Sequence, residues 1–227
     1  MVQGVGSLNV ERQSGTADEL HARDPFIGGR PSGPIVWWCD FSRPAVVLGS
    51  RQQPTVLDEE ACHAAGFDVA RRRSGGGAVV LRPGEMLWID LIVPFGWVDM
   101  PVDVRGSMIW AGERWKAALT LLRVGERVGE LEVHGGGMVH TPWSNLICFA
   151  GLGPGEVLLD GLKLVGLSQR RTRHGCRFQG LVHRCELRSD DLRLFREPRP
   201  EGSPSPVAVL TSGVTGDELC RKLASLI

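Results

Sequence analysis

Residues 71–79 read RRRSGGGAV, and this stretch determines how the rest of the chain is interpreted. It follows an apolar run that begins at Phe67 and leads directly into another apolar run. Three consecutive glycines let the backbone adopt positive φ angles and approach a ligand closely, and their amides can converge on an anion. The flanking arginines add planar cations that pair with phosphate or carboxylate. The stretch predicts an anion-binding loop between two strands, with a tight turn that binds nothing as the alternative.

Two familiar nucleotide-binding motifs do not account for this loop. A P-loop needs the pattern GxxxxGK[ST], which occurs nowhere in the sequence. A dinucleotide-binding turn needs GxGxxG followed by a helix, whereas the glycines at 75–77 lead into the apolar residues 78–81. The loop therefore belongs to another class.

The hydrophobic pattern along the chain predicts an irregular mixture of strands and helices. Short apolar runs bounded by turn residues indicate strands, and apolar residues spaced by three and four from residue 107 onward indicate an amphipathic helix. This mixture favours an α+β fold, a mixed β-sheet flanked by helices, over regular βαβ alternation. The expected strands are residues 35–39, 45–48, 67–71, 86–93, 156–159, 162–165 and 207–210, and the expected helices are residues 18–23, 55–66, 107–122 and 217–227.

The length of the chain suits one domain. With 227 residues it can bury a single substantial core. Residues 1–16 are polar and contain glycine and serine, which predicts a flexible N-terminus. Residues 17–227 are expected to form the single domain, with the proline-rich residues 196–206 as an exposed connector.

Composition excludes several classes of protein. The formal net charge is zero, so no general attraction to nucleic acid or to an anionic membrane is expected. No apolar run reaches the roughly 18 residues of a spanning helix, and residues 1–15 show no signal-peptide pattern. The six cysteines form no CxxC pair, which favours free thiols in a reducing cytoplasm. His134 and His140 lack the helical spacing of a metal site with a third ligand, so no metal centre is expected.

Lys163 is a candidate site residue on a predicted hairpin. Asp160-Gly161 is the favoured two-residue turn between the apolar runs at 156–159 and 162–165. A lysine just after such a turn is commonly a solvated surface residue. The alternative is that its ammonium group meets a carbonyl or phosphate of a substrate.

Cys148 and the basic segment at 166–173 also have two interpretations each. Cys148 lies in the apolar run LICFA, residues 146–150, which favours a buried, inert thiol. A catalytic cysteine needs a reactive thiolate and partial exposure instead. The polar segment after the Lys163 strand is typical of a solvated face, with a binding site as the alternative.

Three ordered blocks together resemble the superfamily of lipoate-protein ligases, octanoyltransferases and biotin-protein ligases. Residues 72–79, RRSGGGAV, resemble the RRxSGGGAV motif of lipoate ligases. Residues 161–170, GLKLVGLSQR, resemble the family stretch that contains a lysine at the position of Lys163. Residues 48–52, LGSRQ, resemble an early G-x-x-Q element. The resemblance runs from about residue 44 to residue 183.

The resemblance implies a mixed-sheet α+β domain like the biotin and lipoate ligase catalytic domain. An acyl chain would lie in an apolar tunnel near the glycine loop, with its carboxyl or acyl-phosphate end against the loop. Lys163 would polarise the carbonyl that the carrier lysine attacks. The implied site consists of Lys163 and Cys148 as catalytic residues, and of Arg72, Arg73, Ser74, Gly75, Gly76, Gly77, Ala78, Gly166, Ser168 and Gln169 as substrate-binding residues.

The resemblance leaves three functions open. The first, which the lipoate-ligase form of the glycine block favours, is a ligase that attaches a lipoyl or octanoyl group to a lysine through an acyl-adenylate, with ATP and Mg²⁺. The second is an octanoyltransferase, which would need no cofactor. It is suggested by Cys148-Phe149, which resembles the cysteine-phenylalanine pair of cysteine-dependent transferases, where the thiol carries the acyl group as a thioester. The third is a catalytically silent binder of acyl groups or acyl-adenylates. It is motivated by Val80-Leu81 and Gln179, which stand where many ligases carry Tyr-His and a histidine.

The partners implied follow from the same resemblance. The acceptor would be a lipoyl carrier domain of the 2-oxoacid dehydrogenase E2 type or the glycine-cleavage H-protein type. The donor would be lipoate or octanoate for a ligase, and octanoyl-acyl carrier protein for a transferase. Residues 207–227 are too few for the C-terminal accessory domain of many ligases, so a ligase would need a separate accessory protein or a different adenylation route.

Overall fold

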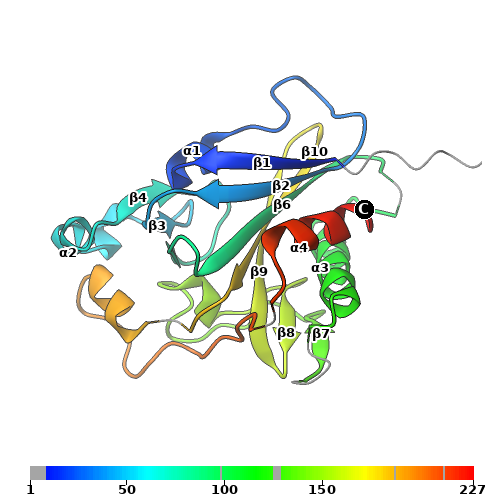
Figure 1. The fold of residues 1–227 in the computed structure, drawn as a ribbon. Helices are drawn as coiled ribbons and strands as arrows, with labels where there is room; N and C mark the ends of the chain where they lie inside the picture. Colours follow the sequence, from blue (N-terminus) through cyan, green and yellow to red (C-terminus); the bar gives the residue numbers. More distant parts are fainter. Residues whose placement is uncertain (1–8, 98, 125–128, 187, 212) are drawn as a thin grey trace, which may run out of the picture.

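The computed structural model describes residues 9–97, 99–124, 129–186, 188–211 and 213–227, and it contains two sheets with helices around them (Figure 1). The larger sheet has the strand order β1-β2-β6-β10-β9-β8-β7, and the smaller has the order β4-β3-β5. Parallel and antiparallel pairs occur in both, so the expected α+β fold with a mixed sheet is confirmed.

The elements have the following bounds. The strands are β1 Val10–Gly15, β2 Ile35–Phe41, β3 Ala45–Leu48, β4 Asp68–Arg71, β5 Val79–Leu81, β6 Met86–Pro94, β7 Leu131–Val133, β8 Val157–Leu159, β9 Leu162–Arg171 and β10 Gly175–His183. The α-helices are α1 Ala17–Ala22, α2 Glu59–Ala64, α3 Val104–Leu121 and α4 Gly216–Ala224, and the 3₁₀ turns are Pro54–Val56, Cys148–Ala150 and Ser189–Leu194.

Strand β6 lies in the interior of the larger sheet, beside the central strand β10, and all nine of its residues are buried. It pairs antiparallel with β2 on one side and with β10 on the other. Leu87, Ile89 and Leu91 face a core formed with α3 and α4, while Met86 and Trp88 face a second core on the opposite side. Because both faces are covered, the strand reads as an apolar run that is interrupted by Asp90.

The second face of the larger sheet is covered by α1 and the smaller sheet (Figure 1). Val47 of β3 and Leu81 of β5 belong to the same core as Trp88 of β6. The glycine run at 75–77 connects β4 to β5, so it lies where the two sheets meet. The fold therefore brings the glycine loop to the face of the larger sheet.

The hairpin around Lys163 is confirmed, and its second strand is longer than expected. Asp160 and Gly161 have φ angles of 51° and 74°, which a tight two-residue turn between antiparallel strands requires. Strand β9 continues from Leu162 to Arg171, because its residues 165–171 pair with β10. The polar segment that was expected to follow the strand is therefore largely part of it.

Three expected elements differ from the structure. The helix expected at 55–66 is a 3₁₀ turn followed by a helix that begins after Asp58, whose side chain accepts from Ala61 N. Part of the expected flexible N-terminus is strand β1, which pairs with β2 in parallel, while residues 1–8 lie outside the described residues. Residues 207–210 form no regular strand, although Ala208 N donates to Lys163 O and Leu210 N donates to His183 O.

No helix in the described ranges has both the length and the apolar character needed to cross a membrane.

Gly112 is where helix α3 contacts the loop before β8. A Cβ built on Gly112 would lie 2.0 Å from the carbonyl oxygen of Gly155, whose own φ is 86°. Alanine favours a helix over glycine by about 1 kcal/mol, but here the methyl group would collide with backbone that cannot rotate away.

We therefore expect Gly112→Ala to lower the free energy of unfolding by about 1–3 kcal/mol, measured by urea denaturation. Glu113→Ala, at the exposed next position, is the control and should change stability by less than about 0.5 kcal/mol. A Gly112→Ala protein that is more stable than the parent would contradict the close contact.

Candidate active site

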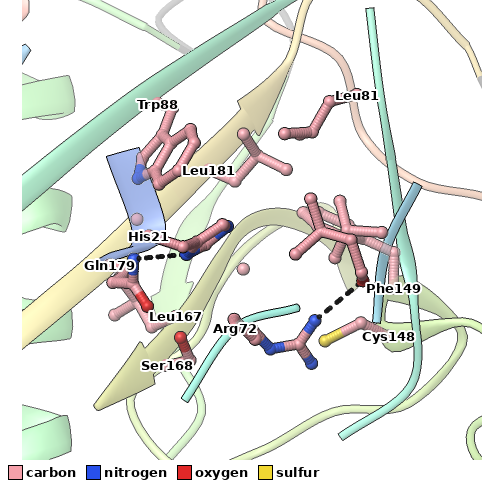
Figure 2. A pocket seen from close by; sticks show the side chains of 14 residues that line it. His21, Arg72, Leu81, Trp88, Cys148, Phe149, Leu167, Ser168, Gln179 and Leu181 are labelled. Atoms are coloured by element: carbon pink, nitrogen blue, oxygen red, sulfur yellow. Dashed lines mark hydrogen bonds between the residues drawn. The ribbon is translucent and has the colours of Figure 1, made fainter. Parts of the chain in front are cut away.

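A largely apolar cavity lies between the glycine loop and the face of the larger sheet (Figure 2). It encloses about 460 Å³, open solvent at its mouth included. Strands β3, β5, β6, β9 and β10 contribute residues, together with α1, the glycine loop and the 3₁₀ turn at 148–150. The lining residues are His21, Val47, Arg72, Val79, Leu81, Trp88, Cys148, Phe149, Gly166, Leu167, Ser168, Gln179, Gly180 and Leu181.

Glycines shape the loop because its backbone lies against two other backbone segments. A Cβ on Gly49 would lie 1.9 Å from the carbonyl oxygen of Gly76, and a Cβ on Gly77 would lie 2.7 Å from the carbonyl carbon of Ile147. Gly76 itself has a φ of 97°. Side chains at these positions would separate the three segments. The glycine run is thus required for packing as well as for any approach to a ligand.

The arginines around the glycines hold the loop in shape. Arg72 is buried, and its Nη2 donates to the carbonyl oxygens of Gly75 and Gly77 at 2.7 Å each. Arg71 donates from Nη1 to the carbonyl oxygens of Gly49, at 3.0 Å, and Gln52, at 2.7 Å. Arg73 is exposed and does not line the cavity. The residues expected to bind an anion therefore use much of their donor capacity on the protein's own backbone.

Cys148 lies at the junction of the glycine loop and the cavity. It is partly exposed, and its backbone N donates to the Ala78 carbonyl oxygen at 2.9 Å. The Cβ position of Gly76 lies 3.6 Å from Cys148 Sγ and 3.0 Å from Arg72 Nη2. Figure 2 shows the sulfur beside the Arg72 guanidinium group. The thiol is thus not buried in the core, unlike the thiols of Cys39, Cys62 and Cys220.

Lys163 is buried, and its ammonium group is surrounded by acceptors. Its Nζ lies 2.7 Å from Glu156 Oε1 and 3.1 Å from the carbonyl oxygens of Cys148 and Gly151. Its Nζ also lies 4.6 Å from the centre of the Phe149 ring. Glu156 in turn accepts from the backbone N of Gly153 and Leu167. Lys163 does not line the cavity, but it holds the 148–156 segment that carries Cys148.

The remaining predicted site residues divide into two groups. Ser74 and Ser168 meet through their hydroxyl groups at 3.0 Å, which joins the glycine loop to β9. Gly166 lines the cavity beside Ser168. Gln169 points elsewhere, because its Nε2 donates to Ser107 Oγ of α3 at 2.8 Å. The structure thus brings the loop, Cys148, Gly166 and Ser168 together and leaves Gln169 and Arg73 outside.

Sequence reasoning missed His21, which lines the cavity from helix α1. Its ring lies 4.4 Å from the Trp88 ring, centre to centre, and its Nδ1 lies 3.1 Å from Gln179 Nε2. Burial, followed by the nearby charges of Arg177 and Arg72, lowers the pKa of His21 to about 3. The capping box of Thr16 and Glu19 marks the start of this helix in the sequence, but nothing in the sequence shows which side of it faces a cavity.

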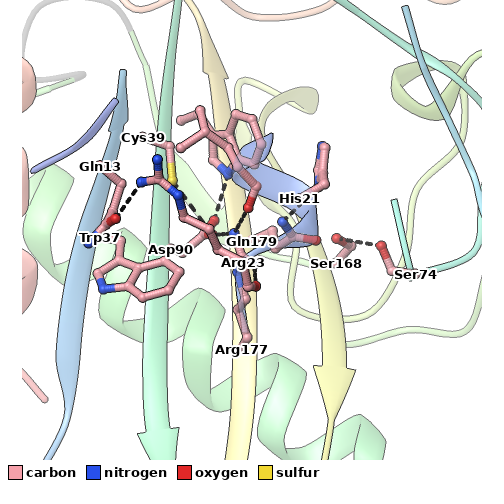
Figure 3. A network of polar contacts seen from close by, with 12 residues as sticks. Gln13, His21, Arg23, Trp37, Cys39, Ser74, Asp90, Ser168, Arg177 and Gln179 are labelled. Atoms are coloured by element: carbon pink, nitrogen blue, oxygen red, sulfur yellow. Dashed lines mark hydrogen bonds and ion pairs between the residues drawn. The ribbon is translucent and has the colours of Figure 1, made fainter. Parts of the chain in front are cut away.

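A buried ion pair anchors the helix that carries His21 (Figure 3). Arg177 of β10 lies 2.6 Å from Asp90 of β6, measured between Nη2 and Oδ2. The same guanidinium group donates to the carbonyl oxygens of Leu20, at 2.9 Å, and Arg23, at 2.8 Å. Arg177 thereby satisfies carbonyl groups at the end of α1 and fixes His21 against the sheet.

The arrangement can hold an apolar chain and present its end to a thiol. Aliphatic and aromatic side chains form most of the wall, and Cys148 and Ser168 lie at the loop side. Such a pocket is suited to an acyl chain. In the described parts of the chain, no three His, Cys, Asp or Glu side chains gather in a way that could hold a metal ion.

Comparison with known proteins places this geometry in context. The family model described as the lipoyl protein ligase A/B catalytic domain matches residues 26–218. A bi-partite lipoate protein ligase from Thermoplasma acidophilum, described together with its E2 lipoyl domain, is 16% identical with a TM-score of 0.67 over 95% of this chain and 80% of that chain. A lipoate-protein ligase A bound with ATP is 16% identical with a TM-score of 0.66, over 95% and 81%. P. falciparum LipL1 in complex with lipoate is 13% identical with a TM-score of 0.61, over 96% and 60%. No curated protein matches the sequence significantly.

The buried pair of Lys163 and Glu156 can be tested by a double-mutant cycle. Lys163→Met leaves the Glu156 carboxylate buried without its cation, so the free energy of unfolding should fall by about 3–5 kcal/mol. Replacing both residues, as Lys163→Met with Glu156→Gln, should recover part of this loss, because no uncompensated charge remains and the amide oxygen can still accept from a backbone N–H. Urea denaturation of the two single variants and the double variant gives the coupling. Additive effects would show that the two groups do not interact.

The two buried histidines predict a loss of stability in acid. Burial, and the nearby charge of Lys163, lower the pKa of His183 to about 4, and His21 has a pKa of about 3. An unfolded histidine titrates near pH 6.5, so below that pH the unfolded state binds more protons than the folded state. The free energy of unfolding is therefore at its full value above about pH 6.5. As the pH falls from there toward the pKa in the folded state, each histidine lowers the free energy of unfolding by up to about 1.4 kcal/mol per pH unit.

The free energy of unfolding of the parent protein should fall between about pH 7.5 and about pH 5. We expect this fall to be smaller by roughly 2 kcal/mol in His21→Phe. Urea denaturation at both pH values measures the change. His63→Phe, at an exposed position, is the control and should lose as much stability as the parent. An equal loss in the His21 variant would mean that His21 takes up its proton in the folded state.

Proposed function

Because this chain belongs to the lipoyl protein ligase A/B catalytic-domain family, we propose that it transfers a lipoyl or octanoyl group to a lysine of a lipoyl carrier domain through a thioester on Cys148. The observation that carries the proposal is the position of Cys148, partly exposed at the junction of the glycine loop and the apolar cavity. An acyl chain in the cavity would have its carbonyl carbon beside this sulfur.

The proposed reaction has two steps that exchange one bond for another. In the first step the sulfur of Cys148 attacks the carbonyl of an acyl thioester on a donor carrier protein. The new S–C bond forms as the donor's C–S bond breaks, and the proton of the Cys148 thiol passes to the donor's sulfur, which leaves as a thiol. In the second step the amine of the acceptor lysine attacks the enzyme thioester. An amide forms, and Cys148 regains a proton.

The glycine loop is the proposed site of charge stabilisation. Both steps place negative charge on the acyl oxygen, and backbone amides fixed in advance stabilise such charge. Gly76 and Gly77 lie beside Cys148, and their backbone amides are the donors that we propose. Arg72 contributes by keeping these amides in place through its bonds to the Gly75 and Gly77 carbonyl oxygens.

Lys163 is proposed to act by positioning and not by contact with the substrate. Its ammonium group binds Glu156 and two carbonyl oxygens, one of them that of Cys148. These bonds fix the backbone that carries the nucleophile. The sequence favoured a ligase in which this lysine polarises the acyl carbonyl, and the engaged ammonium group is the reason that we place the thioester route first.

The ligase that uses ATP is the second candidate function. In its favour, the glycine block has the lipoate-ligase form, and an ATP-bound lipoate-protein ligase A shares the fold. Against it, Lys163 and Arg72 are the buried cations of the site, and both are bonded to acceptors of the protein itself. These residues are poorly disposed to meet a triphosphate, so we derive no step through ATP or Mg²⁺.

The proposed acceptor is a lipoyl carrier domain of the E2 type or the H-protein type. This proposal is supported by the family to which the chain belongs and by the similar bi-partite ligase, which is described together with its E2 lipoyl domain. Octanoyl-acyl carrier protein is the proposed donor, and lipoate or octanoate would replace it for a ligase. A separate accessory protein belongs to the ligase alternative alone.

Intact-mass spectrometry of a lipoyl domain incubated with the protein tests the proposal. One reaction contains octanoyl-acyl carrier protein without ATP, and the other contains lipoate or octanoate with ATP and Mg²⁺. We expect modification in the first reaction and an octanoyl adduct on Cys148. Cys148→Ser should abolish both, a loss of at least about 100-fold, while Cys185→Ser, at an exposed cysteine far from the cavity lining, should retain them.

The other outcomes identify the alternatives. Modification only with ATP, unchanged in Cys148→Ser, would establish the ligase. If neither reaction modifies the domain and Cys148 remains unacylated, the silent binder is favoured over both enzymes.

A further inference from the structure

The cavity has one end at the glycine loop and another at Trp88 of β6. Figure 2 shows Cys148 and Arg72 on one side of the cavity, and Trp88, Leu81 and Leu181 on the opposite side. Trp88 is 3% exposed and Leu81 is 2% exposed, so these two side chains close their end of the cavity from within the core. An acyl chain whose carbonyl carbon lies beside Cys148 would run toward Trp88 and end there.

The indole ring of Trp88 is held in place by several contacts. Its Nε1 donates to Asp90 Oδ1 at 2.6 Å, and Asp90 is itself fixed by the ion pair with Arg177. The His21 ring lies 4.4 Å from the indole ring and the Phe41 ring lies 6.3 Å from it, centre to centre. Rotation of the indole would remove a hydrogen bond from a buried carboxylate, which is costly. The ring is therefore a rigid wall that a longer chain cannot easily displace.

A closed and rigid end makes an apolar cavity sensitive to the length of its ligand. Each additional methylene that is buried strengthens binding about fourfold, until the chain reaches the end of the cavity. A methylene beyond that point has no space, and overpacking weakens binding instead. The affinity for straight acyl chains should therefore pass through a maximum at one length and fall beyond it.

We propose that Trp88 is a specificity-determining residue, which limits the acyl group to the length of an octanoyl chain by closing the cavity opposite Cys148. This inference rests on the part of the proposed function that puts the acyl group in the cavity. Octanoyl and lipoyl groups share the same carbon skeleton, so both would reach the same end wall. Longer acyl groups with the same thioester chemistry would collide with the indole ring. Trp88 thus acts on substrate choice at the far end from the reacting atoms.

Isothermal titration of the full chain with the straight-chain acids hexanoate, octanoate, decanoate and dodecanoate tests the inference. We expect the parent protein to bind octanoate at least about tenfold more tightly than decanoate or dodecanoate. Trp88→Leu keeps an apolar side chain but opens the end of the cavity, so it should bind decanoate about tenfold more tightly than octanoate. The matched control is Phe41→Leu, which also removes a ring from this core but does not line the cavity. It should keep the preference for octanoate.

Leu181→Phe protects the test against a Trp88 variant that does not fold. Leu181 lines the same end of the cavity but is only partly buried, so the fold can accommodate a larger side chain there while the cavity becomes shorter. The parent protein should bind octanoate about tenfold more tightly than hexanoate. The Leu181 variant should bind hexanoate at least as tightly as octanoate.

The outcomes separate this inference from the proposed reaction. Affinity that rises steadily from hexanoate to dodecanoate in the parent protein would overturn the inference, as would a preference for octanoate that is unchanged in both variants. Intact-mass spectrometry after incubation with octanoyl-acyl carrier protein tests the thioester route by itself. If the acids bind with the expected preferences but Cys148 stays unacylated, the thioester route fails and the limit on chain length stands. If no acid binds to the parent protein, the acyl cavity and the inference fail together.

Discussion

The ion pair between Arg177 and Asp90 is the interaction on which the site depends. It joins the two central strands of the larger sheet, β6 and β10, in a fully buried position. The same guanidinium group binds the carbonyl oxygens at the end of α1. A buried charge is tolerated only when paired and hydrogen-bonded, so the pair, the strands and the helix are stable only together. The ion pair therefore fixes the wall of the cavity that α1 forms, although neither Arg177 nor Asp90 lines the cavity.

The positively charged side chains near the cavity bind acceptor groups of the protein itself. Arg72 and Arg71 bind carbonyl groups of the loop and its neighbours, and Lys163 binds Glu156 and the segment that carries Cys148. The positive charges are thereby bonded before any ligand arrives. The space that they enclose is lined mainly by aliphatic and aromatic side chains and by neutral polar groups. This distribution is consistent with the acyl chain that we propose for the cavity, and it leaves Cys148 as the nucleophile of the proposed thioester route.

Sequence patterns predicted those elements of the fold whose conformation or burial is set by residues close together in the chain. The Asp160-Gly161 turn was predictable because only certain residues adopt two successive positive φ angles. Strand β6 was predictable because it is buried on both faces and so reads as an apolar run that is interrupted by Asp90. Strand β1 was not predictable, because its residues are polar and it is held by parallel pairing with a strand more than twenty residues away. Similarly, β9 extends into a basic segment only because β10 pairs with it.

The candidate site was predicted in part for the same reason. The glycine loop and Cys148 carry recognisable residue patterns, whereas the partners of Lys163 are set by the tertiary fold. Glu156 is seven residues away along the chain, and the carbonyl groups that Lys163 binds have no signature in a sequence. His21 was missed because a six-residue helix does not reveal which side faces a cavity.

The position of α1 relative to the matched family segment has a wider consequence. The family model covers residues 26–218, so the glycine loop, Cys148 and Lys163 lie inside it, while His21 lies before its first residue. The chemistry and one wall of the ligand cavity thus come from different stretches of the chain. A substitution at His21 would therefore reshape this wall of the cavity and leave every residue of the matched segment unchanged.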